Sequence, residues 1–209
     1  MTERRRPLKL EFSSLEEELL NKGRIPFVGV DEVGRGPLAG PVVAAAVIWD
    51  YTQSAGGIKD SKLLISKKRQ HLSDYILSKA KAVSIGWASP AEIDSYNVLQ
   101  ASFLAMSRAL NLLEVTPILI LVDGNMEIPS LAVEQLAIKG GDAKITAISA
   151  ASIVAKVARD NLMIYMDSQY PGYGFSRHMG YPTKEHRKAI RDLGPCPIHR
   201  KTFKGVLFD

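Results

Sequence analysis

The sequence contains little cysteine and no long apolar run. Its single cysteine, Cys196, cannot form an internal disulfide or a cysteine-rich metal site. No stretch approaches the roughly 18 apolar residues that a membrane-spanning helix needs. Three arginines at positions 4–6 are followed by Lys9 and Glu11 rather than by the apolar core of a secretion signal. We therefore expect a cytoplasmic protein that makes no contact with a membrane.

Internal repeats, low-complexity tracts and Ser/Gly-rich linkers are also absent. A chain of 209 residues without such dividers is expected to form one domain, with at most a small appendage. Hydrophobic residues make up 46% and charged residues 23%, which is typical of a folded protein rather than a disordered one. A chain of this length buries about 70% of its unfolded surface, so its fold does not need a disulfide or a zinc ion.

The positive charge is concentrated toward the C-terminus. The net charge is +5, and residues 177–209 contain eight Lys or Arg against three acidic residues. Three of the four histidines, His178, His186 and His199, lie in this segment, and we expect them to contact phosphate or to lie at the surface. A local basic field suits a polyanion such as a nucleic acid, but an ordinary solvated segment would have the same composition.

The spacing of apolar residues predicts an α/β protein. Apolar runs predict strands at 27–30, 41–49, 83–87 and 118–122. Helical spacing predicts helices at 66–80, 89–113, 149–170 and 183–194. Ser14 and Glu17 predict a capping box at the start of a further short helix. Two or three strands are followed by strands that alternate with helices, an order that favours a mixed sheet covered by helices.

Acidic residues follow two of the predicted strands. Asp31 and Glu32 come after the first apolar run, and Asp123 comes after the fourth. Each acid alone would fit a turn cap or a salt bridge. Ligand sites of open α/β sheets gather at the carboxyl ends of strands, and converging carboxylates need a cation because they repel one another. The three acids together favour a site for magnesium or manganese, which prefer oxygen ligands.

A glycine-rich turn comes directly after the first acidic pair. Gly34 and Gly36 would let the backbone approach a ligand closely. The turn lacks the Lys-Ser/Thr ending of a P-loop and the downstream pattern of a dinucleotide-binding fingerprint. A fourth acid, Asp142, follows Gly140 and Gly141, but its claim as a ligand is weaker because an ordinary turn residue would have the same surroundings.

Five stretches, in order along the chain, resemble the motifs of bacterial ribonuclease HII. The two longest are Asp31–Val42, which contains the acidic pair and the glycine turn, and Ile148–Asp160. The other three are Lys59-Asp60-Ser61-Lys62, Asp123-Gly124-Asn125 and Gly180-Tyr181-Pro182-Thr183. The similarity extends from about Phe27 to Phe203, which is nearly the whole chain.

The resemblance implies a ribonuclease H-like fold, with a central mixed sheet of five strands flanked by helices. We expect an N-terminal helical segment (1–24), a catalytic core (25–170) and a basic C-terminal helical extension packed on the core (171–209). The implied activity is cleavage of the RNA strand of RNA–DNA hybrids. The resemblance also implies incision on the 5′ side of single ribonucleotides in duplex DNA, which leaves 3′-OH and 5′-phosphate ends.

By the same resemblance, the catalytic and metal-binding acids are Asp31, Glu32, Asp123 and Asp142. They would hold two Mn²⁺ or Mg²⁺ ions. Hydrolysis of a phosphodiester needs an activated water and a stabilised leaving oxygen, and two metal ions can supply both. A Ser–His–Asp triad or a catalytic cysteine is then not required.

The resemblance also implies contacts with the substrate. The turn Gly34-Arg35-Gly36 would contact the ribose 2′-OH, by which RNA differs from DNA. Tyr181 would stack on the deoxyribose after the ribonucleotide, and Lys62 would contact a phosphate near the cut. Two departures from the family pattern are visible: Lys139-Gly140-Gly141-Asp142 has one additional glycine, and Met179 replaces the usual lysine.

Two other functions remain open from the sequence. Another ribonuclease H-like nuclease, or a junction resolvase, would use similar acids without recognising the 2′-OH. A basic nucleic-acid-binding module would not cleave its ligand, although clustered negative charge would not help it to bind phosphate. The tail Val206-Leu207-Phe208 suits either a weak contact with a sliding clamp or simple packing. We expect the protein to be a monomer.

Overall fold

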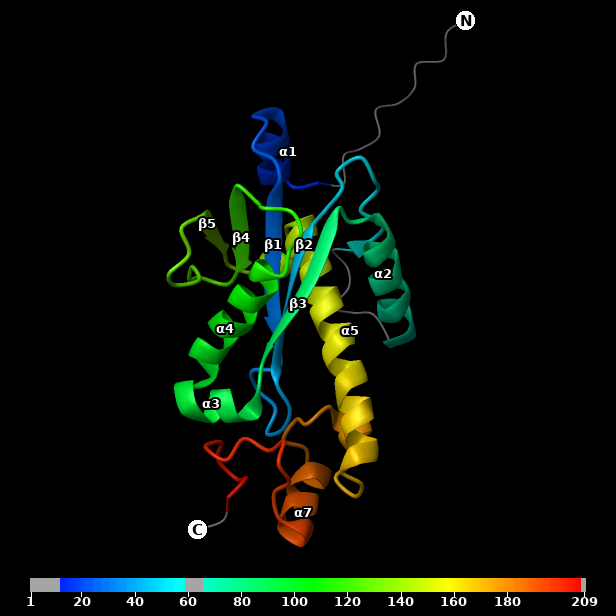
Figure 1. Cartoon of the computed structure of the whole chain (residues 1–209). Helices are drawn as coiled ribbons and strands as arrows, with labels where there is room; N and C mark the ends of the chain where they lie inside the picture. The colour runs from blue at the N-terminus through cyan, green and yellow to red at the C-terminus, as the bar shows by residue number, and fades with distance from the viewer. Residues whose placement is uncertain (1–11, 59–65, 208–209) are drawn as a thin grey trace, which may run out of the picture.

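A mixed sheet of five strands forms the centre of the molecule (Figure 1). The computed structural model describes residues 12–58 and 66–207. The strands are β1 (Phe27–Val33), β2 (Val42–Ile48), β3 (Ala82–Ala88), β4 (Leu119–Asp123) and β5 (Glu134–Ile138). They lie in the order β3-β2-β1-β4-β5, with antiparallel pairing from β3 to β1 and parallel pairing from β1 to β5. The predicted mixed α/β sheet is confirmed.

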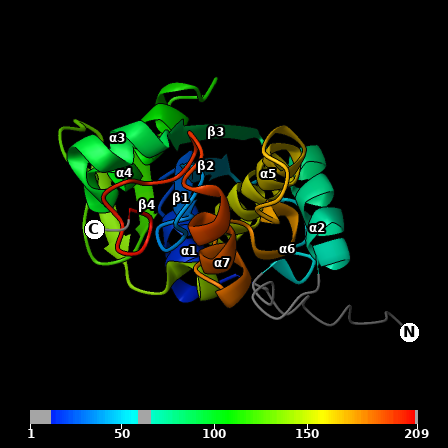
Figure 2. The ribbon, with the colours of Figure 1, turned by 90° about the horizontal axis from the view of Figure 1, so that it is seen from below.

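Helices cover both faces of this sheet (Figures 1 and 2). One face is covered by α3 (Pro90–Tyr96) and α4 (Val98–Asn111). The other face is covered by the long helix α5 (Thr146–Gln169), and α2 (Ser66–Lys79) packs on the outside of α5. Within the two described ranges, no helix has both the length and the apolar composition that crossing a membrane would require.

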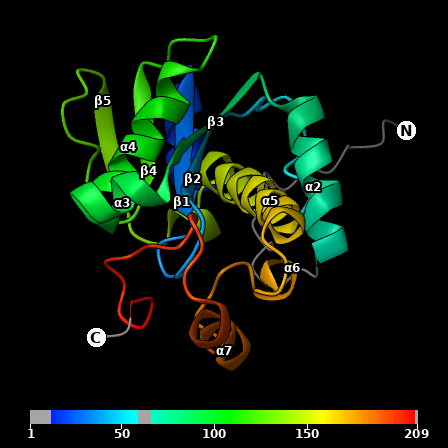
Figure 3. The same cartoon turned by 60° about the horizontal axis from the view of Figure 1, so that its bottom comes forward.

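The remaining helices lie at the two ends of the sheet. At one end lies α1 (Ser14–Asn21). The short helix α6 (Phe175–His178) and α7 (Lys184–Leu193) lie beyond the opposite end, where the chain that leaves β1 also turns (Figure 3). A 3-10 turn, η2 (Gly141–Ala143), precedes α5. The described part of the C-terminal segment therefore lies at the end of the sheet toward which β1 and β4 run.

Two apolar cores, one on each face, explain the continuous apolar runs in the sequence. Phe27 and Leu121 pack in the core on the α5 face, whereas Val28 and Val30 pack in the core on the α4 face. Successive strand residues point to opposite faces, so a strand covered on both faces has no position for a solvated side chain. At Gly29 a side chain would collide with the backbone of α5, so glycine permits the close approach of this helix.

The capping box of α1 lies one residue earlier than predicted. Ser13 rather than Ser14 is the N-cap, and its partner is Glu16 rather than Glu17. The sequence contains both Ser-x-x-Glu pairs, and tertiary contacts select the first. Glu16 is fully buried, and its carboxylate also accepts a hydrogen bond from the Thr146 N–H at 2.7 Å.

Two helix boundaries also differ from the prediction. Helix α5 begins at Thr146, three residues before the predicted start at Ser149. The helical region predicted at 89–113 is divided at Asn97, which has a φ of +70° and caps α4 with its side chain. The edge strand β5 was not recognised from its residues because it is half-exposed and has no apolar run.

Candidate active site

Strand β1 continues beyond its last pair with β4, and this places two carboxylates side by side. The sequence predicted that the strand would end at Val30, but β1 extends to Val33 because its last residues continue to pair with β2. Pairing with β4 ends at Val30 opposite Val122. Asp31 and Asp123 are therefore the next residues of two neighbouring parallel strands. Side chains alternate between the faces of a strand, so both aspartates lie on the same face as Phe27 and Leu121, which is the face covered by α5.

Asp31 lies buried next to other negative charges. It is 6% exposed, its Oδ1 accepts a hydrogen bond from the Glu32 N–H at 2.8 Å, and Ser152 of α5 forms a second hydrogen bond. Burial, followed by the charges of Glu32 and Asp123, raises the pKa of Asp31 well above its ordinary value. The ionised form of this side chain is thus unfavourable until a cation neutralises its surroundings.

Glu32 is balanced only in part by an arginine. The Arg35 Nη1 lies 3.3 Å from Glu32 Oε1, and the glutamate side chain is 12% exposed. Burial raises the pKa of Glu32 by more than the charge of Arg35 lowers it, and Asp123 adds to the increase. The glutamate therefore adds to the excess of negative charge at the end of β1.

The turn before α5 brings Asp142 next to Asp123. The Gly141 N–H donates a hydrogen bond to Asp123 Oδ1 at 2.7 Å, and the Asp142 N–H donates to the same oxygen at 3.4 Å. Gly140 has a φ of +66°, a conformation that favours glycine, so a glycine is suited to this position of the turn. The Ser149 hydroxyl donates to the Asp142 carbonyl, which joins the turn to α5.

The four acids have the donor chemistry of a divalent-metal site. All of them supply hard oxygen ligands, and they lie at one end of β1 and β4. Within residues 12–58 and 66–207, no three of these carboxylates lie close enough together to ligate one ion. The set therefore fits a divalent cation by its chemistry and its charge, and not by a closed coordination sphere.

The glycine turn and Tyr181 meet at the same end of the sheet. A Cβ atom placed on Gly36 would lie 3.6 Å from Cε1 of Tyr181, and the Leu38 N–H donates to the Gly180 carbonyl at 2.8 Å. Tyr181 is 39% exposed, so its ring is not part of the core. Lys62, the fifth expected substrate contact, lies outside the described residues.

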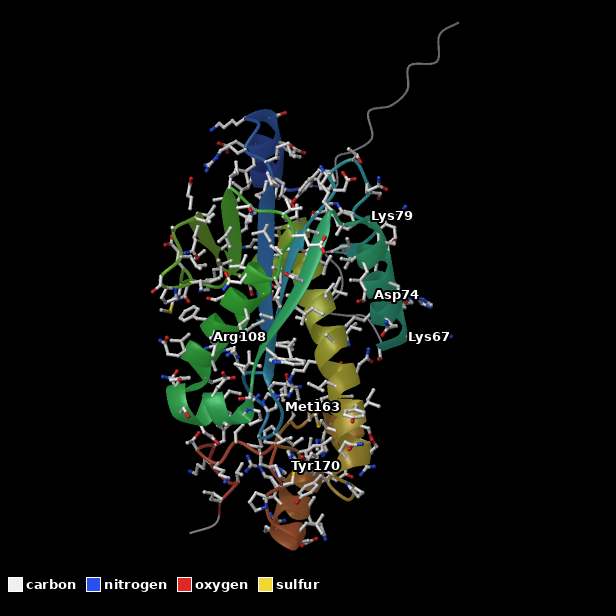
Figure 4. All side chains as sticks on the ribbon, in the orientation of Figure 1. Lys67, Asp74, Lys79, Arg108, Met163 and Tyr170 are labelled. Carbon is white, nitrogen blue, oxygen red and sulfur yellow. The ribbon has the colours of Figure 1, made fainter. Side chains whose placement is uncertain are left out.

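Two buried arginines hold this turn, and neither was predicted from the sequence as a functional residue. Arg159 of α5 donates hydrogen bonds to the backbone carbonyls of Ala39, Pro41 and Met179. Arg200 donates to the carbonyls of Gly34, Arg35 and Gly40. Met163, labelled on the lower part of α5 in Figure 4, leaves no room for a side chain at Gly40. Arg159 lies within the motif Ile148–Asp160, but no sequence pattern distinguishes Arg200 from the other basic residues near it.

The three histidines of the basic segment are buried, so the expectation that they contact phosphate or lie at the surface was wrong. His178, His186 and His199 are 8%, 0% and 2% exposed. The Cys196 N–H donates to His199 Nδ1 at 2.9 Å, and Nε2 of His199 lies 3.0 Å from Nε2 of His186. His186 Nδ1 in turn lies 2.9 Å from the Tyr181 carbonyl. These side chains form the interior of the C-terminal segment.

The structure resembles solved structures of ribonuclease H-like enzymes. The crystal structure of ribonuclease H2 from Pyrococcus horikoshii matches with a TM-score of 0.72 and 28% identity, over 86% of this chain and 94% of that chain. Ribonuclease HII of Archaeoglobus fulgidus, solved as a complex with PCNA, matches with a TM-score of 0.70 and 23% identity, over 86% and 96%. The expected ribonuclease H-like fold, with its flanking helices and C-terminal helices, is confirmed.

The sequence identifies the family within this class. The family model of ribonuclease HII matches residues 28–206. Ribonuclease HII of Nitrosococcus oceani is 54% identical over 178 residues, which cover 85% of this chain and 88% of that protein. Ribonuclease HII of Geobacter metallireducens is 53% identical over 193 residues, covering 92% and 90%. The chain belongs to the ribonuclease HII family, so it is a ribonuclease H hydrolase that cleaves RNA in RNA–DNA hybrids.

Proposed function

We propose that this enzyme also incises duplex DNA on the 5′ side of single embedded ribonucleotides, leaving 3′-OH and 5′-phosphate ends. The observation that carries the proposal is the position of the glycine turn Gly34-Arg35-Gly36, which follows Asp31 and Glu32 after a single residue and lies beside Tyr181. A group that recognises one ribose is thereby placed next to the acids that would hold the metal. Recognition and cleavage would then act on the same nucleotide.

In this proposal Asp31, Glu32, Asp123 and Asp142 hold two divalent ions, Mn²⁺ or Mg²⁺. When bound, such ions supply an activated water and stabilise the charge on the leaving oxygen. The chain itself contributes the acids and their support. Ser152 and the Glu32 N–H orient Asp31, and the Gly141 N–H orients Asp123.

Backbone groups of the turn would bind the ribose 2′-OH, which both donates and accepts hydrogen bonds. The exposed ring of Tyr181 would stack on the deoxyribose that follows the ribonucleotide. Lys62 would contact a phosphate near the cut. Met179 supplies no positive charge at the position where the family usually has a lysine, but its carbonyl is bound by Arg159, so the residue still takes part in holding the loop.

The test is cleavage of a labelled DNA duplex that contains one ribonucleotide, compared with the same duplex made only of DNA. Each is incubated with MgCl₂, MnCl₂ or EDTA. We expect a nick on the 5′ side of the ribonucleotide, only with metal, and no cleavage of the DNA duplex. Equal cleavage of both duplexes would assign a general nuclease of the same fold. Binding without any cleavage would assign a binding module.

We also propose that the enzyme acts in the cytoplasm and that it is a monomer. A sliding-clamp contact through the C-terminal tail draws support from the Archaeoglobus fulgidus complex with PCNA. In this chain Val206 is fully buried against Leu38 and Ile190, whereas Leu207 is 53% exposed. Of the described tail residues only Leu207 is therefore available, and we expect Leu207→Ala to weaken co-elution with a sliding clamp without changing the monomeric elution volume.

A further inference from the structure

Arg200 forms an unusual set of contacts for a residue of a basic segment. Its side chain is fully buried, and its guanidinium donates to the Gly34 carbonyl at 2.6 Å and to the Arg35 carbonyl at 3.0 Å. It also donates twice to the Gly40 carbonyl, at 2.9 and 2.8 Å. Among the described residues, no carboxylate lies within ion-pair distance of it. Its hydrogen bonds thus go to backbone carbonyls, while the Phe203 ring lies 5.0 Å from the guanidinium and the charge of Asp94 acts on it from beyond ion-pair distance.

Burying a guanidinium without a carboxylate partner costs free energy, and this cost lowers the pKa of the side chain. Burial, together with the charge of Arg159, lowers the pKa of Arg200 to about 9. A residue that served only to fill this space would be better apolar. The planar guanidinium instead has several N–H donors in a rigid arrangement, so it can bind several carbonyls at the same time.

The hydrogen bonds to the carbonyls determine where the neighbouring N–H groups point. In a trans peptide, C=O and N–H point in opposite directions. Because the carbonyls of Gly34 and Arg35 point at Arg200, the N–H groups of Arg35 and Gly36 point away from it. Both residues are exposed, and within residues 12–58 and 66–207 neither N–H donates to a protein acceptor. Two successive free N–H groups of this kind form a site for an oxygen that carries negative or partial negative charge.

We propose that Arg200 is a positioning residue for ribose recognition: by fixing the Gly34 and Arg35 carbonyls, it presents the Arg35 and Gly36 N–H groups to the ribonucleotide. This inference rests on the proposed function, since it specifies how the same turn distinguishes ribose from deoxyribose. It also assigns a role to the C-terminal extension beyond nonspecific attraction of the duplex. The segment after Arg200 is fixed separately, because the Asp94 carboxylate accepts hydrogen bonds from the N–H groups of Lys201 and Thr202, at 2.9 and 3.0 Å.

The experiment measures the preference for a ribonucleotide rather than activity alone. Dissociation constants for the duplex with one ribonucleotide and for the all-DNA duplex are measured by fluorescence anisotropy, in an Asp123→Asn background that binds without cleaving. Arg200→Met and Arg200→Lys are compared with two controls. Arg177→Met removes an exposed positive charge of the same segment, and Asp94→Ala loosens the segment without removing the guanidinium.

We expect Arg200→Met to reduce the ribose preference at least tenfold while the affinity for the all-DNA duplex changes by less than threefold. Arg200→Lys should restore part of the preference, because an ammonium group retains the charge but satisfies fewer carbonyls. Both controls should change the two affinities by the same factor. In the active enzyme, Arg200→Met should lower kcat as well as raise KM, since the ribose would no longer be held beside the acids.

A preserved preference in Arg200→Met would overturn the inference, as would an equal loss of affinity for both duplexes. Absence of any preference in the Asp123→Asn parent would instead overturn the proposed function, and this inference with it. Thermal unfolding of each variant is measured first. If Arg200→Met does not fold, the same comparison with Arg200→Lys decides, because a folded lysine variant with full preference would equally contradict the proposed role.

Discussion

Asp31 is the residue at which folding stability and the proposed metal binding make opposite demands. A buried carboxylate flanked by Glu32 and Asp123 has its pKa raised, so its ionised form costs folding free energy. The stability associated with its protonated form is present at low pH and is lost as the pH rises through the raised pKa. The proposed role as a metal ligand requires the ionised form, so the metal-free protein would be destabilised by this carboxylate.

We therefore predict that Asp31→Asn stabilises the metal-free protein and abolishes cleavage. In EDTA at pH 7, its Tm should exceed that of the wild type by a few degrees, since about 1 kcal/mol corresponds to roughly 2–4 °C for a chain of this size. Added MnCl₂ should raise the Tm of the wild type more than that of the variant. Asp192→Asn, an exposed residue paired with Lys188, is the control and should leave Tm nearly unchanged. A lower Tm for Asp31→Asn in EDTA would show that the carboxylate is not under this strain.

Asp123→Asn is expected to keep the fold and the substrate affinity but to lose nearly all cleavage. The asparagine side-chain oxygen can still accept the Gly141 N–H, so the turn before α5 is retained. Loss of a metal ligand removes several kcal/mol of transition-state stabilisation, which corresponds to a decrease in kcat of roughly a thousandfold. Single-turnover cleavage and anisotropy measure the two properties separately. Retained cleavage would refute the metal-site assignment.

For Tyr181→Ala we predict a loss of activity without a loss of stability. The ring is 39% exposed, so its removal creates no large cavity, and Tm should change by less than about 3 °C. Stacking of an aromatic ring on a base contributes about 1–3 kcal/mol, and a similar contribution from the contact with the deoxyribose would make kcat/KM at a single ribonucleotide fall roughly 5- to 150-fold. Tyr165→Ala, which removes a more exposed tyrosine from α5, is the control. Normal rates for Tyr181→Ala would remove this residue from the site.

Among the elements, α7 and the loops on either side of it depend on neutral histidines. His186 lies on α7, His199 follows in the C-terminal segment, and their Nε2 atoms lie 3.0 Å apart. Burial lowers the pKa of each to about 4. His199 Nδ1 accepts the Cys196 N–H, so its Nε2 carries the proton and donates to Nε2 of His186. Protonation of His186 removes the acceptor of this contact, and protonation of His199 removes the acceptor of the Cys196 N–H.

We predict that the free energy of unfolding decreases as the pH falls from about 6.5 to about 4. In this window the unfolded chain binds protons at His186 and His199 while the folded protein does not, so stability rises with pH. Urea unfolding at a series of pH values measures the slope, which should report up to two protons from these residues. His199→Asn should flatten the dependence, whereas His71→Asn, an exposed histidine of α2, should not. An unchanged slope in His199→Asn would contradict the prediction.

At the scale of the whole molecule, we expect the net charge to affect the affinity for every duplex and the glycine turn to determine the preference for ribose. The net charge of +5 acts on any duplex through its phosphates, and this attraction weakens with salt. We predict that raising KCl from 50 to 200 mM weakens binding of the ribonucleotide duplex and the all-DNA duplex by the same factor, at least about tenfold. In the proposed function the ribose preference depends on the turn, so the ratio of the two affinities should stay constant. A preference that disappears with salt would mean that recognition is mainly electrostatic.

The fold could be predicted in outline because its signals are local. The apolar runs of β2 and β4 and the helical spacing of α4 and α7 are visible in short windows. Boundaries were less accurate where pairing decides them: β1 extends past Val30 because β2 continues beside it. The half-exposed β5 has no local signal, and its presence followed only from the resemblance. The division into 1–24, 25–170 and 171–209 stays a proposal.

By itself, the sequence determined the α/β class and the family, since both depend on patterns and motifs that are visible in short windows of the chain; the same motifs predicted the acids and the glycine turn as the site. Only the tertiary structure revealed what supports them. Arg200 contacts carbonyls about 160 positions earlier, and the histidines of a basic segment became its interior. The physical reason is that burial and long-range hydrogen bonding depend on where the chain returns to itself, and a buried arginine or histidine has the same letter as an exposed one.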